Sequence, residues 1–278
     1  MQNGISRNIV NLSGGKDSTA LAVYLKQNPD ILSKYNPENP EVEYVFCDTG
    51  KELKETYEYL NKVEVFLGQP IVRLNSEFSF DHWLAVNSGF LPSARMRWCT
   101  RLLKLKPFEK YIGEDLIYSF VAIRADENRD GYISKKPNIQ TFYPFKDDGK
   151  VIDDVYQLLE DSGLGKPDYY VWRTRSGCYF CFFQRKSEWI GLKNNHPDLF
   201  QKAKEYEKEY EDGTRFTWQQ NESLDELAQR EPQIMEQKKK AEERIKKNNP
   251  NMTLMQVFEN AHSEFEDTDQ DACTMCEH

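Results

Sequence analysis

The segment SGGKDS at residues 13–18 constrains the possible fold of this chain more than any other segment does. It follows a short apolar run and opens a helical pattern. Its two adjacent glycines let the backbone approach an anion closely. The start of a helix then directs unpaired N–H groups and a partial positive charge at that anion. Lys16 adds a mobile full charge, and Ser13 and Ser18 add hydroxyl donors. The segment predicts a phosphate-binding turn between a strand and a helix.

The composition is typical of a soluble protein. Charged residues make up 30% of the 278 residues, and the mean hydropathy is -0.79. No apolar run approaches the roughly 18 residues that a membrane span needs, and the N-terminus does not resemble a signal peptide. We expect a cytoplasmic location and no membrane partner. Two C-x-x-C pairs among six cysteines favour metal or redox chemistry over a disulfide framework.

Charge is unevenly distributed along the chain. The net charge of -9 argues against a broadly basic surface for nucleic acid. Residues 95–110 nevertheless hold a single acid and six cations, which are Arg95, Arg97, Arg101, Lys104, Lys106 and Lys110. Solvated surface charge explains most such runs, and a basic groove beside the phosphate-binding turn is the alternative.

Apolar runs and helical patterns alternate over residues 1–150. We expect strands at 9–12, 43–47, 71–74 and 116–123 and helices at 17–27 and 53–66. Such alternation indicates an α/β fold with a parallel sheet flanked by helices. The turn after the first strand then lies at the carboxyl edge of the sheet, where these sheets bind ligands.

The pattern changes after about residue 149, which suggests three parts: 1–150, a helical region at 151–250, and an acidic tail at 251–278. Expected helices in the second part cover 151–159, 187–193, 198–211 and 223–247, the last broken near Pro232. The nearly all-charged run at 238–247 lacks an apolar stripe and predicts an exposed helix or linker. Each of the last two parts carries one C-x-x-C pair.

The spacing within SGGKDS differs from the Walker phosphate loop, G-x-x-x-x-G-K-[ST]. It instead resembles the signature of the PP-loop ATP pyrophosphatases, which bind ATP and cut it between the α and β phosphates. The resemblance implies that this segment holds nucleotide phosphates. The alternative is a glycine-rich turn with no chemical use.

Six further motifs follow the turn. They are CDTG at 47–50, RMRWC at 95–99, IRADENR at 123–129, YPF at 143–145, DDVY at 153–156 and SGCYFC at 176–181. Over about residues 8–183 this order resembles the phosphoadenosine phosphosulfate reductase family. The resemblance implies a HUP-type, Rossmann-like domain that binds an adenine nucleotide, and a smaller, mainly helical, cysteine-bearing region after it.

The same resemblance supplies candidate nucleotide- and phosphate-binding residues. They are Ser13, Gly14, Gly15, Lys16, Asp17, Ser18, Asp48, Arg97, Arg124 and Arg129. Asp48 is expected near the ribose or a metal ion, and Arg124 and Arg129 near phosphate or sulfate oxygens. The planar fork of arginine binds such oxyanions bidentately. The alternative for these two arginines is ion pairing with Asp126 and Asp130.

The branches of the family differ in the number and spacing of their cysteines. Adenylylsulfate reductases bind a [4Fe–4S] cluster through an adjacent Cys-Cys pair and a later C-x-x-C. Here Trp98 stands in the place of one cysteine, and Cys99, Cys178 and Cys181 remain as candidate ligands. Three thiolates can hold a cluster with one iron left open, which resembles the tRNA thiolation enzymes. Zn²⁺ with a fourth ligand from the tail is one alternative, and unligated thiols are another.

The tail carries Cys273 and Cys276 and ends at His278. Reductases without a cluster end in a Glu-Cys-Gly-x-His segment whose cysteine attacks the sulfate sulfur, but here the order differs and the glycine is absent. One hypothesis brings Cys276 to the phosphate-binding turn, where a nearby Arg or Lys would favour a catalytic thiolate. The alternative is an untethered acidic tail.

The intact Lys16 and glycine pair favour real ATP cleavage. A substrate oxygen would attack the α phosphate, and pyrophosphate would leave, stabilised by Lys16, backbone N–H groups and Mg²⁺. Asp17 and Asp48 are candidates for organising Mg²⁺. A sulfur nucleophile would then displace AMP. We expect an adenylating sulfurtransferase with a nucleic acid as candidate acceptor and a cysteine desulfurase as candidate sulfur donor, similar to the DNA phosphorothioation sulfur-transfer subunit.

Two other functions stay open. A sulfonucleotide reductase would make sulfite with electrons from thioredoxin. A non-catalytic nucleotide-binding subunit would belong to a larger phage-defence or DNA-modification complex. An oligomer is compatible with each of these functions.

Overall fold

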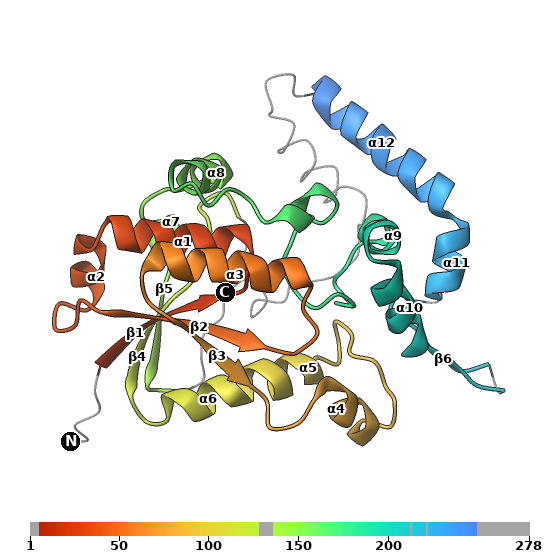
Figure 1. The fold of residues 1–278 in the computed structure, drawn as a ribbon, viewed down its shortest axis with the longest axis horizontal. Coiled ribbons are helices and arrows are strands. Elements are labelled where there is room, and N and C mark those ends of the chain that lie inside the picture. Colours follow the sequence, from red (N-terminus) through yellow and green to blue (C-terminus); the bar gives the residue numbers. More distant parts are fainter. Residues whose placement is uncertain (1–5, 128–135, 212, 221, 249–278) are drawn as a thin grey trace.

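The computed structural model describes residues 6–127, 136–211, 213–220 and 222–248. A five-stranded parallel sheet in the order β3-β2-β1-β4-β5 confirms the predicted α/β fold (Figure 1). The strands are β1 Ser6–Leu12, β2 Val42–Asp48, β3 Ile71–Asn75, β4 Leu116–Phe120 and β5 Ile139–Phe142. The strand order switches direction between β1 and β4, which is where sheets of this type bind ligands.

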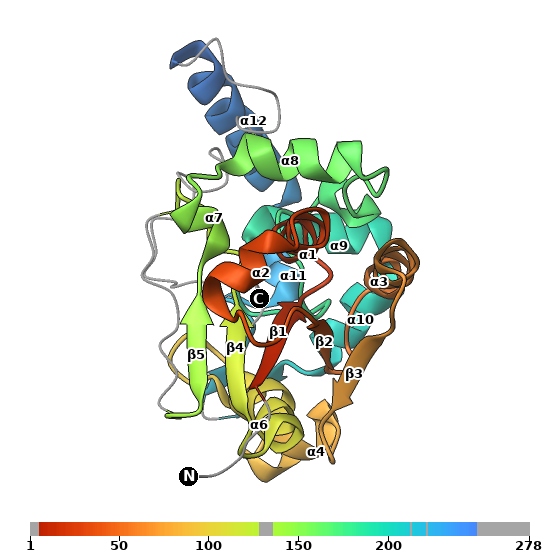
Figure 2. The same cartoon turned by 90° about the vertical axis from the view of Figure 1, so that its left-hand side faces the viewer.

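Helices cover both faces of the sheet (Figure 2). One face carries α1 Lys16–Gln27, α3 Lys54–Leu67 and α8 Ile152–Asp161, and the other carries α6 Lys106–Ile112. Neighbouring residues of β1 therefore point into different cores. Val10 packs in a cluster with residues of α1, α3 and α8, whereas Ile9 packs in a cluster with residues of α6. Burial on both sides explains why β1 reads as a continuous apolar run.

Short elements complete this part of the chain. They are α2 Asp30–Tyr35, α4 Phe80–Val86, α5 Trp98–Thr100, the π-helix η1 Arg101–Leu105 and α7 Pro144–Asp147. A mainly helical region follows α8, as expected. It contains the 3₁₀ turn η2 Asp168–Val171, α9 Lys186–Asn195, α10 Pro197–Glu205, β6 Lys208–Glu209, β7 Arg215–Phe216, α11 Leu224–Gln229 and α12 Glu231–Asn248.

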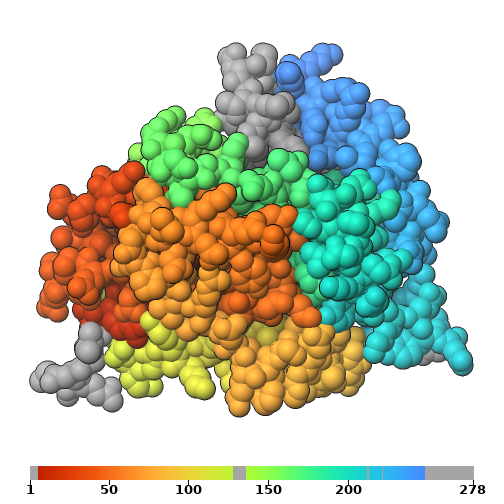
Figure 3. All heavy atoms as spheres, viewed as in Figure 1, coloured from red at the N-terminus to blue at the C-terminus, as the bar shows by residue number. Residues whose placement is uncertain are grey.

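The helical region packs directly against the sheet part (Figure 3). Its core is aromatic, and the rings of Phe180 and Trp218 stack with centroids 4.9 Å apart. The N–H of Tyr179 donates to the carbonyl of Lys51 at 2.8 Å. The cysteine-bearing segment is thereby fixed beside the loop that follows β2.

Four details differ from the sequence-based expectations. β4 ends at Phe120 rather than at residue 123, and β5 was not predicted. The helix expected at 198–211 ends at Glu205 and is followed by a short hairpin. The segment 238–247 does have an apolar stripe, because Ala241 and Ile245, one turn apart on α12, are both buried.

The break expected near Pro232 is present, since α11 and α12 are separate helices. Pro232 itself occupies the first turn of α12, where proline costs no intrahelical hydrogen bond. In the described ranges, no helix combines the length and the apolar character that crossing a bilayer requires.

Candidate nucleotide site

The SGGKDS turn joins β1 to α1 at the carboxyl edge of the sheet. Gly14 has φ +75°, a left-handed conformation that side chains disfavour. A Cβ added to Gly14 would lie 2.6 Å from Cγ2 of Thr56 on α3. Glycine is therefore required here both by the backbone conformation and by the close approach of α3.

Serine side chains fix the shape of the turn. The N–H of Ser13 donates to Oγ of Ser18 at 3.1 Å, and the N–H of Gly15 donates to Oγ of Ser13 at 3.3 Å. The two serine hydroxyls lie 3.0 Å apart. Gly15 is the N-cap of α1 and provides no side-chain cap. The first N–H groups of α1 therefore point out of the helix toward the centre of the turn.

Charged side chains converge beside the turn. Nζ of Lys16 lies 3.1 Å from Oδ2 of Asp17, and a guanidinium nitrogen of Arg124 lies 2.6 Å from Oδ1 of the same carboxylate. Burial alone would raise the pKa of Asp17, but the positive charges of Lys16 and Arg124 outweigh it and lower the pKa to about 2. Asp17 thus holds two cations at the start of α1.

Arg124 follows β4 and is held by three carboxylates. Besides Asp17, it contacts Asp126 at 2.9 Å and Glu127 at 2.8 Å. The ion-pairing alternative with Asp126 is therefore present in the structure, and a role in phosphate binding stays a prediction. Arg129, the other arginine of this motif, lies outside the described residues.

A segment far away in the sequence covers the turn. The N–H of Lys16 donates to the hydroxyl of Tyr170 at 3.1 Å. The hydroxyl of Tyr169 donates to the carbonyl of Gly14 at 2.8 Å, and that of Ser176 donates to Oγ of Ser13 at 2.9 Å. The sequence analysis assigned no role to these three side chains, although Ser176 begins the SGCYFC motif.

Asp48 lies at the end of β2. Its Oδ1 accepts hydrogen bonds from the N–H of Gly50 at 2.8 Å and from the hydroxyl of Tyr57 at 2.7 Å. The pKa of Tyr57 is raised, first by burial and then by this bond to Asp48. Asp48 keeps its second oxygen, Oδ2, outside these two bonds. Its expected contact with ribose or metal stays a prediction.

The three candidate ligand cysteines pack against one core. Cys178 lies beside the loop after β2, with Sγ 3.2 Å from Oγ1 of Thr49 and 3.6 Å from Oε1 of Glu52. Cys181 follows one turn later, since its N–H donates to the carbonyl of Cys178. Cys99, in α5, packs against the same aromatic core.

The metal-ligand role predicted for Cys99, Cys178 and Cys181 stays a prediction in the part of the chain that the structure describes. There, no group of three or more His, Cys, Asp and Glu side chains is arranged to hold a metal ion. The tail cysteines Cys273 and Cys276, and His278, lie outside the described residues. We therefore assign no chemical step to a [4Fe–4S] cluster or to Zn²⁺.

Arg97 lies immediately before α5. Its guanidinium donates to the carbonyl of Ala94 at 3.2 Å and lies 5.0 Å from the ring centroid of Phe183. These contacts place Arg97 against the cysteine-bearing region. Its predicted contact with phosphate stays a prediction.

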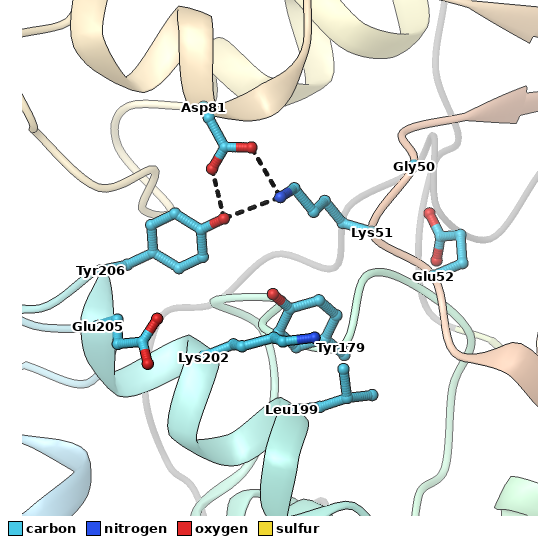
Figure 4. Close-up of a pocket in the computed structure, with 9 residues that line it drawn as sticks. All are labelled: Gly50, Lys51, Glu52, Asp81, Tyr179, Leu199, Lys202, Glu205 and Tyr206. Carbon is cyan, nitrogen blue, oxygen red and sulfur yellow. Dashed lines mark hydrogen bonds and ion pairs between the residues drawn. The ribbon is translucent and has the colours of Figure 1, made fainter.

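A polar pocket of about 640 Å³ is lined by residues of the loop after β2, of α4 and of α10, and by Tyr179 and Tyr206 (Figure 4). Its lining includes Glu52, which also contacts Cys178, and Leu199 of α10. Nζ of Lys51 lies 2.8 Å from Asp81 and donates to the hydroxyl of Tyr206 at 2.9 Å. Glu52 thus contacts both the pocket and the Cys178 thiol, whose Sγ lies 3.6 Å from its Oε1.

Comparison with known proteins finds a family profile that matches the first half of the chain. The profile of the phosphoadenosine phosphosulfate reductase domain matches residues 7–146. An uncharacterized protein of Methanocaldococcus jannaschii is 31% identical over 216 residues, which are 73% of this chain and 42% of that protein. A second protein of this organism is 25% identical over 206 residues, 68% of this chain and 45% of that protein. The chain spans less than half the length of these two relatives.

An uncharacterized protein of Escherichia phage 186 is 25% identical over 264 residues, 72% of this chain and 74% of that protein. Among solved structures, phosphoadenylyl-sulfate reductase from Candida auris in its phosphate complex covers 62% of this chain and 81% of its own, with TM-score 0.45 and 13% identity. The U34-tRNA thiolase NcsA from Methanococcus maripaludis with its [4Fe–4S] cluster matches 74% of this chain and 71% of its own, with TM-score 0.39 and 18% identity.

These relatives do not support the expected resemblance to the DNA phosphorothioation subunit. The match to the family profile, by contrast, is long enough to assign the chain to a family. Because it covers half of the 278 residues and includes the turn at 13–18, the chain belongs to the phosphoadenosine phosphosulfate reductase domain family.

Proposed function

We propose that this protein binds ATP at the SGGKDS turn and cleaves it between the α and β phosphates, so that an acceptor is adenylated for sulfur transfer. An acceptor oxygen attacks the α phosphorus, and the bond to the bridging oxygen breaks. Pyrophosphate leaves with the electron pair of that bond. A sulfur nucleophile then displaces AMP from the acceptor. Family membership supports the binding of an adenine nucleotide. The positive charge and the N–H donors of the turn support the cleavage of its phosphate bond.

The observation that carries the proposal is the position of the Lys16 ammonium. Asp17 holds it at the start of α1, beside N–H groups that point out of the helix. Negative charge grows on the β phosphate as pyrophosphate leaves, and donors fixed in advance stabilise that charge most effectively. Arg124 acts in this proposal as a positioning residue, because it anchors Asp17.

The sulfur step is assigned to the region around Cys178. This cysteine follows Ser176, which contacts the turn, by two residues, and it adjoins the pocket through Glu52. The pocket would admit the acceptor, for which a nucleotide of a nucleic acid is the candidate. Iron and acid-labile sulfide in anaerobically purified protein would require the cysteine region to rearrange from the geometry described above.

A sulfonucleotide reductase is the second candidate, and it is favoured by the family to which the chain belongs. The two functions differ in products. With ATP, cellular nucleic acid and a sulfide source, our proposal predicts AMP and pyrophosphate. With phosphoadenosine phosphosulfate and reduced thioredoxin, it predicts no sulfite. Sulfite formation without pyrophosphate release would overturn the proposal in favour of the reductase.

A further inference from the structure

Residues 169–178, which we call the strap, lie across the phosphate-binding turn. A Cβ added to Gly15 would lie 2.8 Å from Oγ of Ser176 and 3.1 Å from the hydroxyl oxygen of Tyr170. The turn and the strap are thus in direct contact, with no room for a phosphate between them. Lys16 is only 6% exposed and Ser13 only 9% exposed. A nucleotide reaches these groups only if the strap moves.

The hydroxyl of Tyr170 occupies a position suited to a phosphate oxygen. It accepts a hydrogen bond from the N–H of Lys16, one of the donors at the start of α1 that the helix itself does not satisfy. The Lys16 ammonium lies 5.5 Å from the centroid of the same ring. A neutral hydroxyl is a weaker acceptor for this donor than an anionic oxygen. Phosphate can therefore replace the hydroxyl with a gain in hydrogen-bond strength.

The strap also reaches the cysteine pair. Arg173, whose side chain is fully buried, donates to the carbonyl of Gly177 at 3.0 Å and to that of Cys178 at 3.0 Å. Gly177 has φ +140°, which lets the chain turn sharply between Ser176 and Cys178. These contacts link the strap to the backbone of Cys178.

The base of the strap is anchored on α9. The N–H and the hydroxyl of Thr174 both donate to Oε1 of Glu188 at 2.7 Å. A Cβ added to Gly191 would lie 2.6 Å from the ring of Trp172, so the strap packs tightly on this helix. The anchored base leaves Tyr169, Tyr170 and Ser176, on either side of it, as the contacts with the turn.

We propose that Tyr170 and Ser176 compete with the nucleotide for the phosphate-binding turn, and that phosphate binding releases the strap and shifts Cys178. This inference rests on the proposed binding of ATP at the turn. It makes the cysteine region sensitive to the occupancy of the nucleotide site. Cys178 then occupies its shifted position only when the nucleotide is bound.

The first experiment compares the affinities of the full chain and two variants for ATP and for inorganic pyrophosphate. Tyr170→Phe keeps the ring but removes the competing acceptor, and we expect about threefold to tenfold tighter binding of both ligands. Tyr169→Phe is the matched control. It loses a hydrogen bond to the carbonyl of Gly14, an acceptor that phosphate cannot replace, so its gain in affinity should be smaller than that of Tyr170→Phe.

The second experiment measures hydrogen exchange in the wild-type chain with and without ATP. Exchange is expected to slow at residues 13–18 and to accelerate in the strap. Slower exchange in both segments, or equal affinities of wild type and Tyr170→Phe, would overturn the inference while leaving ATP binding intact. If neither the wild type nor Tyr170→Phe binds ATP or pyrophosphate, the proposed function is wrong and the inference fails with it.

Discussion

Arg124 and Asp17 are 107 residues apart in sequence, yet a guanidinium nitrogen of one lies 2.6 Å from a carboxylate oxygen of the other. The contact joins the loop after β4 to the first turn of α1. These two elements flank the position where the strand order of the sheet switches direction. The ion pair thus ties together the two sides of the crevice in which the nucleotide is expected to bind.

Replacing Arg124 by lysine tests whether the geometry of this contact matters. Lysine keeps the charge but cannot contact Asp17, Asp126 and Glu127 together, because it lacks the planar fork. We expect Arg124→Lys to weaken ATP binding by about tenfold, which corresponds to ~1.4 kcal/mol. Titration calorimetry measures the change. Arg73→Lys, on the exposed edge of β3, is the control and should bind ATP like the wild type.

The pH dependence of stability reports on Asp17. Its pKa falls from the ordinary value of 3.8 to about 2 in the folded protein, so its carboxylate stabilises the fold above pH 3.8. That contribution, of about 2 kcal/mol, is lost as the pH falls through 2. We expect the difference in unfolding free energy between wild type and Asp17→Asn to shrink between pH 5 and pH 2. A constant difference over that range would contradict the ion-pair geometry.

Gly14 and Gly50 provide a matched pair of substitutions. Both have positive φ, but only at Gly14 would a Cβ meet a neighbouring atom, Cγ2 of Thr56. We expect Gly14→Ala to cost about 2–4 kcal/mol of unfolding free energy and Gly50→Ala about 1 kcal/mol. The double variant Gly14→Ala with Thr56→Ser should recover part of the loss. Denaturant unfolding measures all four proteins, and equal costs at both glycines would refute the close approach.

Glu188 anchors the strap and is fully buried. Burial alone would raise its pKa, but the charges of Arg185, Arg175 and Arg173 lower it. Glutamine cannot accept as many hydrogen bonds from the surrounding donors, so Glu188→Gln should cost about 2–4 kcal/mol.

The control for this substitution is Glu236→Gln on α12. Its carboxylate is exposed and pairs with the exposed Lys240, so the substitution should leave the unfolding free energy almost unchanged. A comparable loss at both positions would show that Glu188 does not anchor the strap.

Local sequence signals predicted most of the sheet and the turn between β1 and α1 at residues 13–18. The strands β1 and β2 read as apolar runs because helices bury them on both faces. β5 was missed because it is short and none of its residues is fully buried, so no apolar run marks it. The stripe at 238–247 was missed because Ala241 and Ile245 stand there among charged neighbours, and Ile234, the next buried residue on α12, lies outside that segment.

The strap could not be predicted from local patterns. Its hydrogen bond from the N–H of Lys16 to Tyr170 joins residues 154 positions apart, and a buried tyrosine in a loop has no periodicity that reveals its partner. The same applies to Arg124, whose nearest acidic neighbours in sequence predicted Asp126 but not Asp17. The sequence therefore predicted the residues of the turn better than the groups that surround them.

The most direct test of the account is a comparison of the affinities of the wild-type chain and Lys16→Met for ATP and AMP. A turn that holds the β and γ phosphates should bind ATP at least about tenfold more tightly than AMP, and Lys16→Met should remove most of that difference. Lys54→Met, at an exposed position on α3, is the control and should keep it. Equal wild-type affinities for ATP and AMP, or no binding of either, would contradict the account.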